Sequence, residues 1–88
     1  PLQTQFYTHI CTGTLKKVEQ FIKKHPKLLN EPFEDGSLPL HVAIDLHKKS
    51  IARMFIKRNA DAILKDSKNL DALDHAYSAG EQKIAEYL

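Results

Sequence analysis

The 88-residue chain contains one cysteine, no long apolar run and no signal-peptide pattern at its start. The single cysteine, Cys11, excludes an internal disulfide and favours a reducing compartment, so we expect an intracellular protein of the cytoplasm or nucleus. Apolar runs of only a few residues exclude a membrane span. The first residue is Pro1 rather than methionine. We therefore expect a processed chain or a fragment of a longer protein.

The motifs of common enzyme classes are also missing. The sequence has no glycine-rich phosphate loop, no G-x-S-x-G elbow and no G-x-G-x-x-G fingerprint. His41 and His47 are six residues apart, which places them on different faces of one helix, and no Cys or His cluster completes a zinc site. We expect no catalytic residues, no metal, no cofactor and no small-molecule substrate. A catalytic domain elsewhere in a full-length protein stays open.

The net charge of +2 is too small to predict nucleic-acid binding. One stretch, 14–30, is nevertheless strongly basic, with a single glutamate beside Lys16, Lys17, Lys23, Lys24 and Lys27. A stretch of this kind favours either a solvated helix face or a phosphate-binding surface. No aromatic residues alternate with these lysines as base stacking would require. We therefore favour the solvated face and do not expect nucleic acid or phosphoinositide as a partner.

The strongest pattern is an internal repeat. When the sequence is shifted against itself by a constant interval, apolar and turn positions coincide: Gly36 with Asn69, Leu40 with Leu73, Ala43 with Ala76, Ile51 with Ile84, and Phe55 with Leu88. A weaker copy lies upstream, in residues 9–30. A period of about 33 residues indicates stacked supersecondary units rather than one irregular domain.

Each unit reads as a turn, a short helix, a longer helix and a connecting loop. Pro39 suits the first turn of a helix, which should end near His47. A second helix, over 51–58, places its apolar residues on one face, and Asn59 tolerates the left-handed conformation at its end. Asp71 can cap the short helix that follows. These patterns predict an all-α chain.

In these stretches the chain resembles the ankyrin-repeat family. The segments "DGSLPLHVAI", "SIARMFI" and "NAD" match the family's motifs in order, and "DSKNLDALDHA" and "GEQKIAEYL" match them again one period later. Upstream, "GTLKKVEQFI" and "PKLLN" resemble a first repeat. The resemblance implies an ankyrin-repeat solenoid of stacked helix-turn-helix units with hairpin-like loops. It also implies that His41 is a structural histidine that hydrogen-bonds loop backbone between repeats.

The chain departs from the family pattern at several positions. The threonine that caps the first helix is replaced by Leu38, which cannot cap, and by Asp71, which can. The loop glycine is Gly36 in one copy and Asn69 in the next. The glycine between paired helices is His47 in the middle copy. We expect one domain over 1–88, with a degenerate repeat at about 4–33, a complete one at 34–66 and an incomplete one at 67–88, continued by further repeats or another domain of the same protein.

The resemblance further implies binding through loop tips and the concave face of the first helices. The expected loop-tip residues are Glu34, Asp35, Ser37, Ser67, Lys68 and Leu70, and the expected helix residues are Val42, Asp45, Leu46, His75, Ser78 and Ala79. An exposed cluster of Val42, Leu46 and Leu70 would favour a protein partner, but these residues can equally pack inside. We thus expect a protein-interaction module, or alternatively a regulatory or targeting segment of a larger enzyme. His9, His25 and His75 show no promising neighbours in the sequence.

Overall fold

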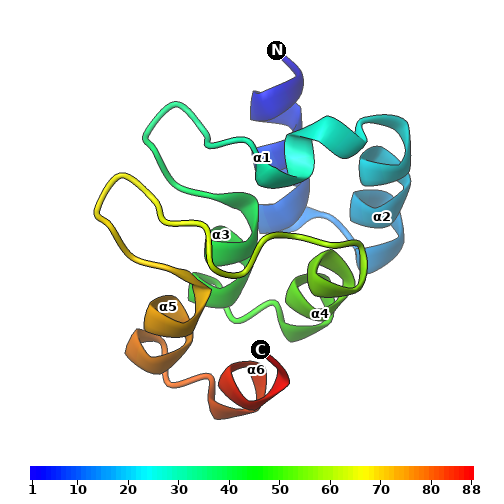
Figure 1. Ribbon diagram of the computed structural model, residues 1–88. Coiled ribbons are helices and arrows are strands. Elements are labelled where there is room, and N and C mark those ends of the chain that lie inside the picture. The colour runs from blue at the N-terminus through cyan, green and yellow to red at the C-terminus, as the bar shows by residue number, and fades with distance from the viewer.

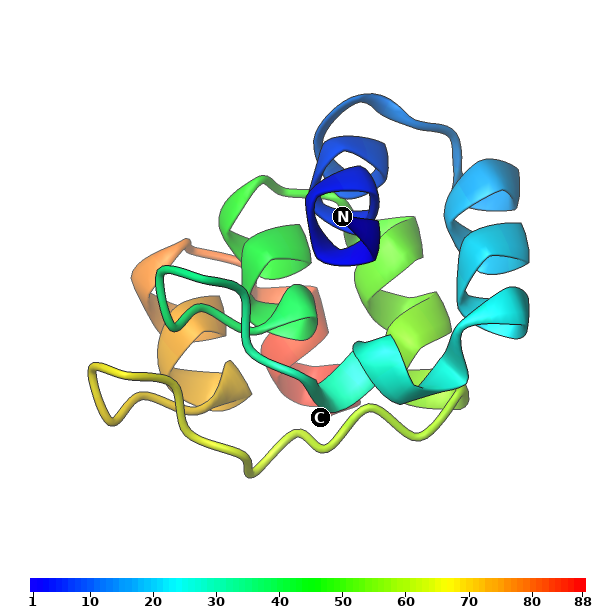
Figure 2. The same cartoon turned by 90° about the horizontal axis from the view of Figure 1, so that it is seen from above.

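A computed structural model describes all residues, 1–88. It consists of six α-helices and one short 3-10 helix: α1 (Leu2–Thr12), α2 (Leu15–Lys24), η1 (Pro26–Asn30), α3 (Pro39–Asp45), α4 (Lys49–Lys57), α5 (Ala72–Ser78) and α6 (Gln82–Tyr87). Figure 1 shows three successive helix pairs stacked on one another. The first helices of the pairs form one layer and the second helices another (Figure 2). The predicted all-α fold of stacked helix pairs is confirmed. None of the helices has the length and apolar character needed to cross a bilayer.

Helices α3 and α5 begin where the sequence predicts, whereas α4 spans Lys49–Lys57 and so begins two residues before the expected 51–58. Pro39 is the first residue of α3, and Leu38 before it provides no side-chain cap. Asp71 caps α5 by accepting a hydrogen bond from the Asp74 backbone N–H at 3.0 Å, and the Asp74 carboxylate accepts one from the Asp71 N–H at 3.1 Å. This capping box satisfies two N–H groups that the first helical turn leaves free.

The turns between paired helices repeat with the same period. The Lys48 N–H donates to the Ala43 carbonyl at 2.9 Å, and one period later the Glu81 N–H donates to the Ala76 carbonyl at 2.8 Å. In each turn the preceding residue is left-handed: His47 has φ 60° and Gly80 has φ 71°. A non-glycine residue in this conformation costs roughly 1–2 kcal/mol.

Two loops project on the same side of the molecule (Figure 1). In the first loop, the Phe33 N–H donates to the Ser37 carbonyl and the Gly36 N–H donates to the Phe33 carbonyl. In the second loop, the Asp66 N–H donates to the Leu70 carbonyl and the Asn69 N–H donates to the Asp66 carbonyl. Gly36 and Asn69 are both left-handed, as the turn requires. The loops stack on one another because the Ser67 N–H donates to the Gly36 carbonyl at 3.2 Å.

One apolar core runs through all three helix pairs. Phe6 of α1 lies near its centre, with ring centroids 5.6 Å from Phe21, 5.8 Å from Phe33 and 5.8 Å from Phe55. Phe6 and Phe55 are fully buried, and burial of such a side chain contributes about 1.5–3 kcal/mol. The first helix pair is thus packed onto the second through aromatic contacts.

The stacking of the two loops makes a specific prediction about Gly36. A Cβ there would lie 2.4 Å from Ser67 Oγ and 2.5 Å from Ser67 Cβ, whereas a Cβ at Gly80 meets nothing. Both glycines are left-handed, so Gly80→Ala is the matched control for backbone strain. We expect Gly36→Ala to lower the free energy of unfolding by about 1–2 kcal/mol more than Gly80→Ala, measured by urea denaturation. In a Ser67→Gly background, Gly36→Ala should cost no more free energy of unfolding than Gly80→Ala. Equal losses for the two alanine variants in the wild-type background would contradict a close approach of Ser67 to Gly36.

Candidate functional site

The two loops and the first helices enclose a groove of about 240 Å³. Eight of the residues expected at the binding face line it: Asp35, Ser37, Val42, Asp45, Leu46, Ser67, Lys68 and His75. Tyr7 of α1 and Asp66 of the second loop, which the sequence patterns did not single out, complete the lining. We call this site the concave groove.

The four remaining predicted residues lie outside the groove lining. Glu34 lines an adjoining cavity of about 350 Å³, which shares Tyr7 and Asp35 with the concave groove. Leu70 and Ser78 are exposed. Ala79 packs partly against the core.

For Val42 the sequence left two positions open, the exposed face and the interior, and the structure places it largely inside. Its side chain is only 6% exposed and belongs to the core. The cause is the position of α3, a seven-residue helix packed between α1, α4 and α5, in which every residue from Pro39 to Ile44 is buried. Val42 therefore forms part of the groove floor, while Leu46, one turn later, remains 42% exposed.

His75 is a correction, because the sequence showed no promising neighbours for it and the structure gives it two acidic ones. Its Nδ1 lies 2.9 Å from Asp45 Oδ1, and its Nε2 lies 2.7 Å from Asp66 Oδ2. A neutral imidazole has one N–H, so donation to both carboxylates requires the protonated ring. Burial opposes that charge, but the hydrogen bonds to Asp45 and Asp66 outweigh it and raise the pKa of His75 above its usual 6.5.

Asp66 connects this ion pair to the second loop. Its Oδ1 accepts hydrogen bonds from the backbone N–H of Lys68 at 2.9 Å and of Leu70 at 3.0 Å. Burial would raise the pKa of Asp66, but the bonds from Leu70, His75 and Lys68 lower it far below the usual range. The carboxylate therefore stays ionised while it fixes both the loop and the imidazole.

His41 does not make the backbone hydrogen bond that the family resemblance implies. The side chain is 1% exposed, and neither ring nitrogen has a hydrogen-bond partner. Its Nδ1 lies 3.5 Å from Asp66 Oδ2, and its ring stacks on His75 with centroids 4.3 Å apart. Burial and the positive charge of His75 lower the pKa of His41 below 6.5, so His41 is the neutral member of the stacked pair.

The residues His41, Asp66 and His75 bring three potential metal-binding atoms within 4.8 Å of one another. Their orientation does not suit one ion. The two rings are nearly parallel, at 29°, whereas an imidazole binds a metal along a lone pair in its own plane. The short His75–Asp66 contact is also already a hydrogen bond. The arrangement holds a proton between carboxylates and does not converge on a metal.

The concave groove also contains Ser37 and Ser67 near His75, which raises the question of a nucleophile and base. In a serine-histidine-aspartate triad, one ring nitrogen contacts the aspartate and the other accepts the serine proton. In this groove both nitrogens of His75 are occupied by carboxylates. His75 therefore cannot accept a proton from either serine in this arrangement.

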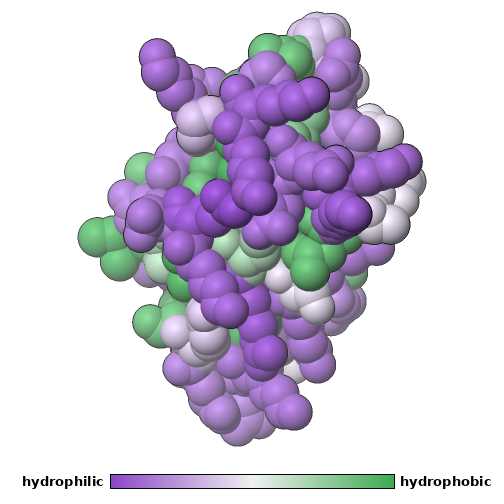
Figure 3. Space-filling view, turned by 90° about the vertical axis from the view of Figure 1, so that its right-hand side faces the viewer, coloured by the Kyte–Doolittle hydropathy of each residue, from purple (hydrophilic) through white to green (hydrophobic).

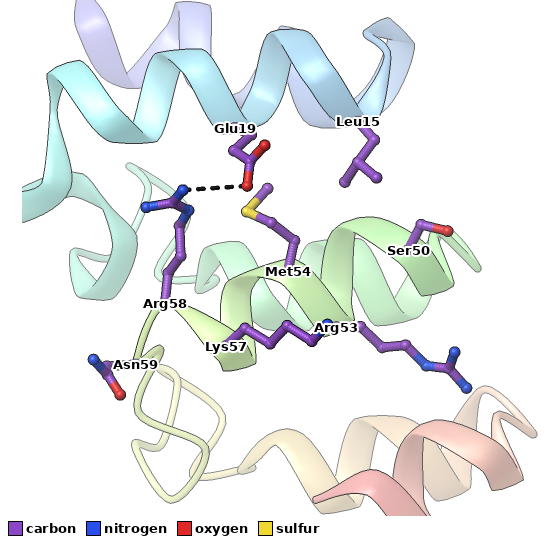
Figure 4. A pocket seen from close by; sticks show the side chains of 8 residues that line it. All are labelled: Leu15, Glu19, Ser50, Arg53, Met54, Lys57, Arg58 and Asn59. Carbon is purple, nitrogen blue, oxygen red and sulfur yellow. Dashed lines mark hydrogen bonds and ion pairs between the residues drawn. The ribbon is translucent and has the colours of Figure 1, made fainter.

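A wider cavity, of about 750 Å³, lies on the other side of the molecule between α2 and α4. Figure 4 shows Glu19 and Arg58 joined across it, with Nη2 and Oε2 3.2 Å apart, while the Arg53 guanidinium points away from both. Arg53 lies over the ring of Tyr87. This face of the molecule is mostly hydrophilic (Figure 3). Its cations do not converge on a common point, so the concave groove is the better candidate site.

Of the two residues that the sequence patterns missed, only Asp66 has a signal in the sequence. Tyr7 precedes Gly13 by six residues, as His41 precedes His47, so it corresponds to His41, which is buried and does not line the groove. Asp66 lies one period after Phe33, at the start of the equivalent turn. An aspartate at this position can accept hydrogen bonds from the following backbone N–H groups.

In a comparison with known proteins, no family model matches the chain, but a relative does. The ankyrin repeat domain-containing protein 13C-B of Xenopus laevis is 27% identical over 81 residues, which cover 90% of this chain. The chain spans 15% of that protein's length.

The raised pKa of His75 predicts how stability depends on pH. The folded state holds this proton more tightly than the unfolded state, so the contribution is complete below pH 6.5 and is lost as the pH rises through the folded-state pKa. We expect His75→Gln to lower the free energy of unfolding by about 1–2 kcal/mol near pH 6 and by less near pH 9, in urea denaturation.

An Asp45→Asn background is the control for this trend. It removes one of the two carboxylates that hold the proton, so the effect of His75→Gln should then vary less with pH. If the free energy of unfolding lost in His75→Gln stays constant or grows as the pH rises, His75 is not held as a cation.

Proposed function

We propose that this chain, which resembles the ankyrin-repeat family in sequence and in fold, is a protein-interaction module that binds a protein partner through the concave groove. The observation that carries the proposal is the convergence of residues from two loops, α1, α3 and α5 on one groove. Repeats over 4–33, 34–66 and 67–88 would then act as one domain whose first helices and loop tips form the binding face. We place this module in the cytoplasm or nucleus.

The composition of the groove supports a protein partner. Tyr7 and Leu46 are partly exposed apolar side chains among polar neighbours. Protein interfaces typically combine such an apolar centre, often aromatic, with a polar rim. The loops are tied to each other and to α5 by hydrogen bonds, so little ordering would be needed on binding.

A regulatory or targeting segment within a larger enzyme is the second candidate. Leu73 and Tyr77, one turn apart on α5, are exposed, and Ile63 of the connecting loop is 80% exposed. Apolar residues at the end of a repeat stack are usually covered by a neighbouring unit. A further repeat or another domain of the same protein would then be the partner of this surface, and the full-length sequence would distinguish the two candidates.

Two leucines on opposite sides of the molecule provide a matched test. Leu46, in the concave groove, and Leu15, at the cavity between α2 and α4, are each 42% exposed. We expect Leu46→Glu to abolish retention of partner proteins from an extract of the protein's own cells, because it places a charge at the apolar centre of the groove. Leu15→Glu should retain the same proteins as the wild type, as identified by mass spectrometry.

Circular dichroism controls for folding, since both leucines are largely solvated and both variants should keep the wild-type helicity. Retention that depends on Leu15 and not on Leu46 would move the binding face to the α2–α4 side. Retention unaffected by either change would also contradict binding through the concave groove.

A further inference from the structure

The charge of the concave groove is opposite to that of the chain as a whole. The chain carries 13 lysines and arginines against 11 acidic residues. The groove lining contains the carboxylates of Asp35, Asp45 and Asp66 against two cations, Lys68 and the protonated His75. Asp66 is fully occupied by His75 and the loop backbone, which leaves Asp35 and Asp45 as the carboxylates available to a ligand.

Both available carboxylates are held in place by neighbouring hydrogen-bond donors, and neither is joined to a lysine or arginine by a hydrogen bond, although Lys68 acts on Asp35 through its charge. Asp35 Oδ1 accepts hydrogen bonds from the Ser37 N–H at 3.0 Å and from the Ser37 hydroxyl at 2.6 Å. These bonds lower the pKa of Asp35, so it is ionised at neutral pH. Asp45 is positioned by His75, yet its side chain is half exposed. Each carboxylate therefore keeps accepting capacity that faces solvent.

Tyr7 provides an aromatic surface close to both carboxylates. Its ring packs edge-on against Phe33, with centroids 5.0 Å apart, and the side chain remains 39% exposed. Burial, together with the nearby carboxylates of Asp35 and Asp45, raises the pKa of Tyr7 above 10.0, which agrees with the shared lining of the groove. An aromatic face beside two carboxylates is an arrangement that favours a cation.

We propose that Tyr7, Asp35 and Asp45 form a subsite for an arginine side chain of the partner protein, with an adjacent apolar residue packing on Leu46. This proposal rests on the proposed function, because it names the chemistry of the segment that the groove would bind. A planar guanidinium can stack on the tyrosine ring while it donates hydrogen bonds to a carboxylate. Lysine offers only a point charge and should bind more weakly.

The test uses two blocked tripeptides, acetyl-Leu-Arg-Leu-amide and acetyl-Leu-Gln-Leu-amide, titrated into the ¹⁵N-labelled 88-residue chain and followed by NMR. We expect the arginine peptide to shift the amide signals of Tyr7, Asp35, Asp45 and Leu46, and to bind at least about tenfold more tightly than the glutamine peptide. The affinity difference should shrink as sodium chloride is added.

Charge-neutralising variants localise the effect. Asp35→Asn and Asp45→Asn should each lower the affinity for the arginine peptide toward that for the glutamine peptide. The asparagine oxygen can still accept the local hydrogen bonds. Asp61→Asn is the matched control, because Asp61 also accepts a hydrogen bond from the backbone N–H two residues later, at 3.1 Å from Ile63, but lies outside the groove. It should leave the affinity unchanged.

The outcomes separate this subsite from the proposed function. Equal binding of both peptides in the groove overturns the arginine subsite and leaves the protein-binding groove in place. Shifts confined to other surfaces, no shifts with either peptide, or an equal loss of affinity in Asp61→Asn also overturn the subsite. The purification with Leu46→Glu and Leu15→Glu then decides independently whether the groove binds a protein.

Discussion

The concave face depends on the carboxylate of Asp66. One of its oxygens fixes the second loop through two backbone N–H groups, and the other binds His75 of α5. His75 in turn binds Asp45 at the end of α3. Helices of six or seven residues are not stable alone, so contacts of this kind and the burial of apolar faces must hold them. One protonated imidazole between two carboxylates thus joins the loop and the first helices of two repeats.

Much of the fold follows from the sequence because it depends on local chemistry that recurs with a fixed period. Pro39 and Asp71 start their helices where the sequence predicts, and Asn59 and Asn69 adopt the left-handed conformation expected of asparagine at such turns. The constant period of the repeats predicts the stacking, since each unit can bury its apolar face only against a neighbour. These features need only near neighbours along the chain, and a single sequence therefore contains them.

The candidate site was harder to predict because its contacts join residues far apart in the sequence. Asp45 and His75 are 30 residues apart, and nothing local to either one indicates the other. The sequence left open whether Val42 is exposed or buried, and the packing of a seven-residue helix against three neighbours buries it. His41 was expected to bond loop backbone; instead the position of His75 gives it a stacking partner. The burial and partners of these residues depend on how the repeats pack.

His75 is a cation held between two carboxylates, and this ion pair builds the concave groove. The side-chain ¹⁵N NMR spectrum of His75 at pH 6.5, with assignment confirmed by His75→Gln, tests this directly. We expect two protonated ring nitrogens as the predominant state of His75, with correlations to both, while the stacked His41 shows a single neutral tautomer. A predominantly neutral His75 with one bare nitrogen would mean that the ring bonds to only one of the two carboxylates, and would rule out the ion pair.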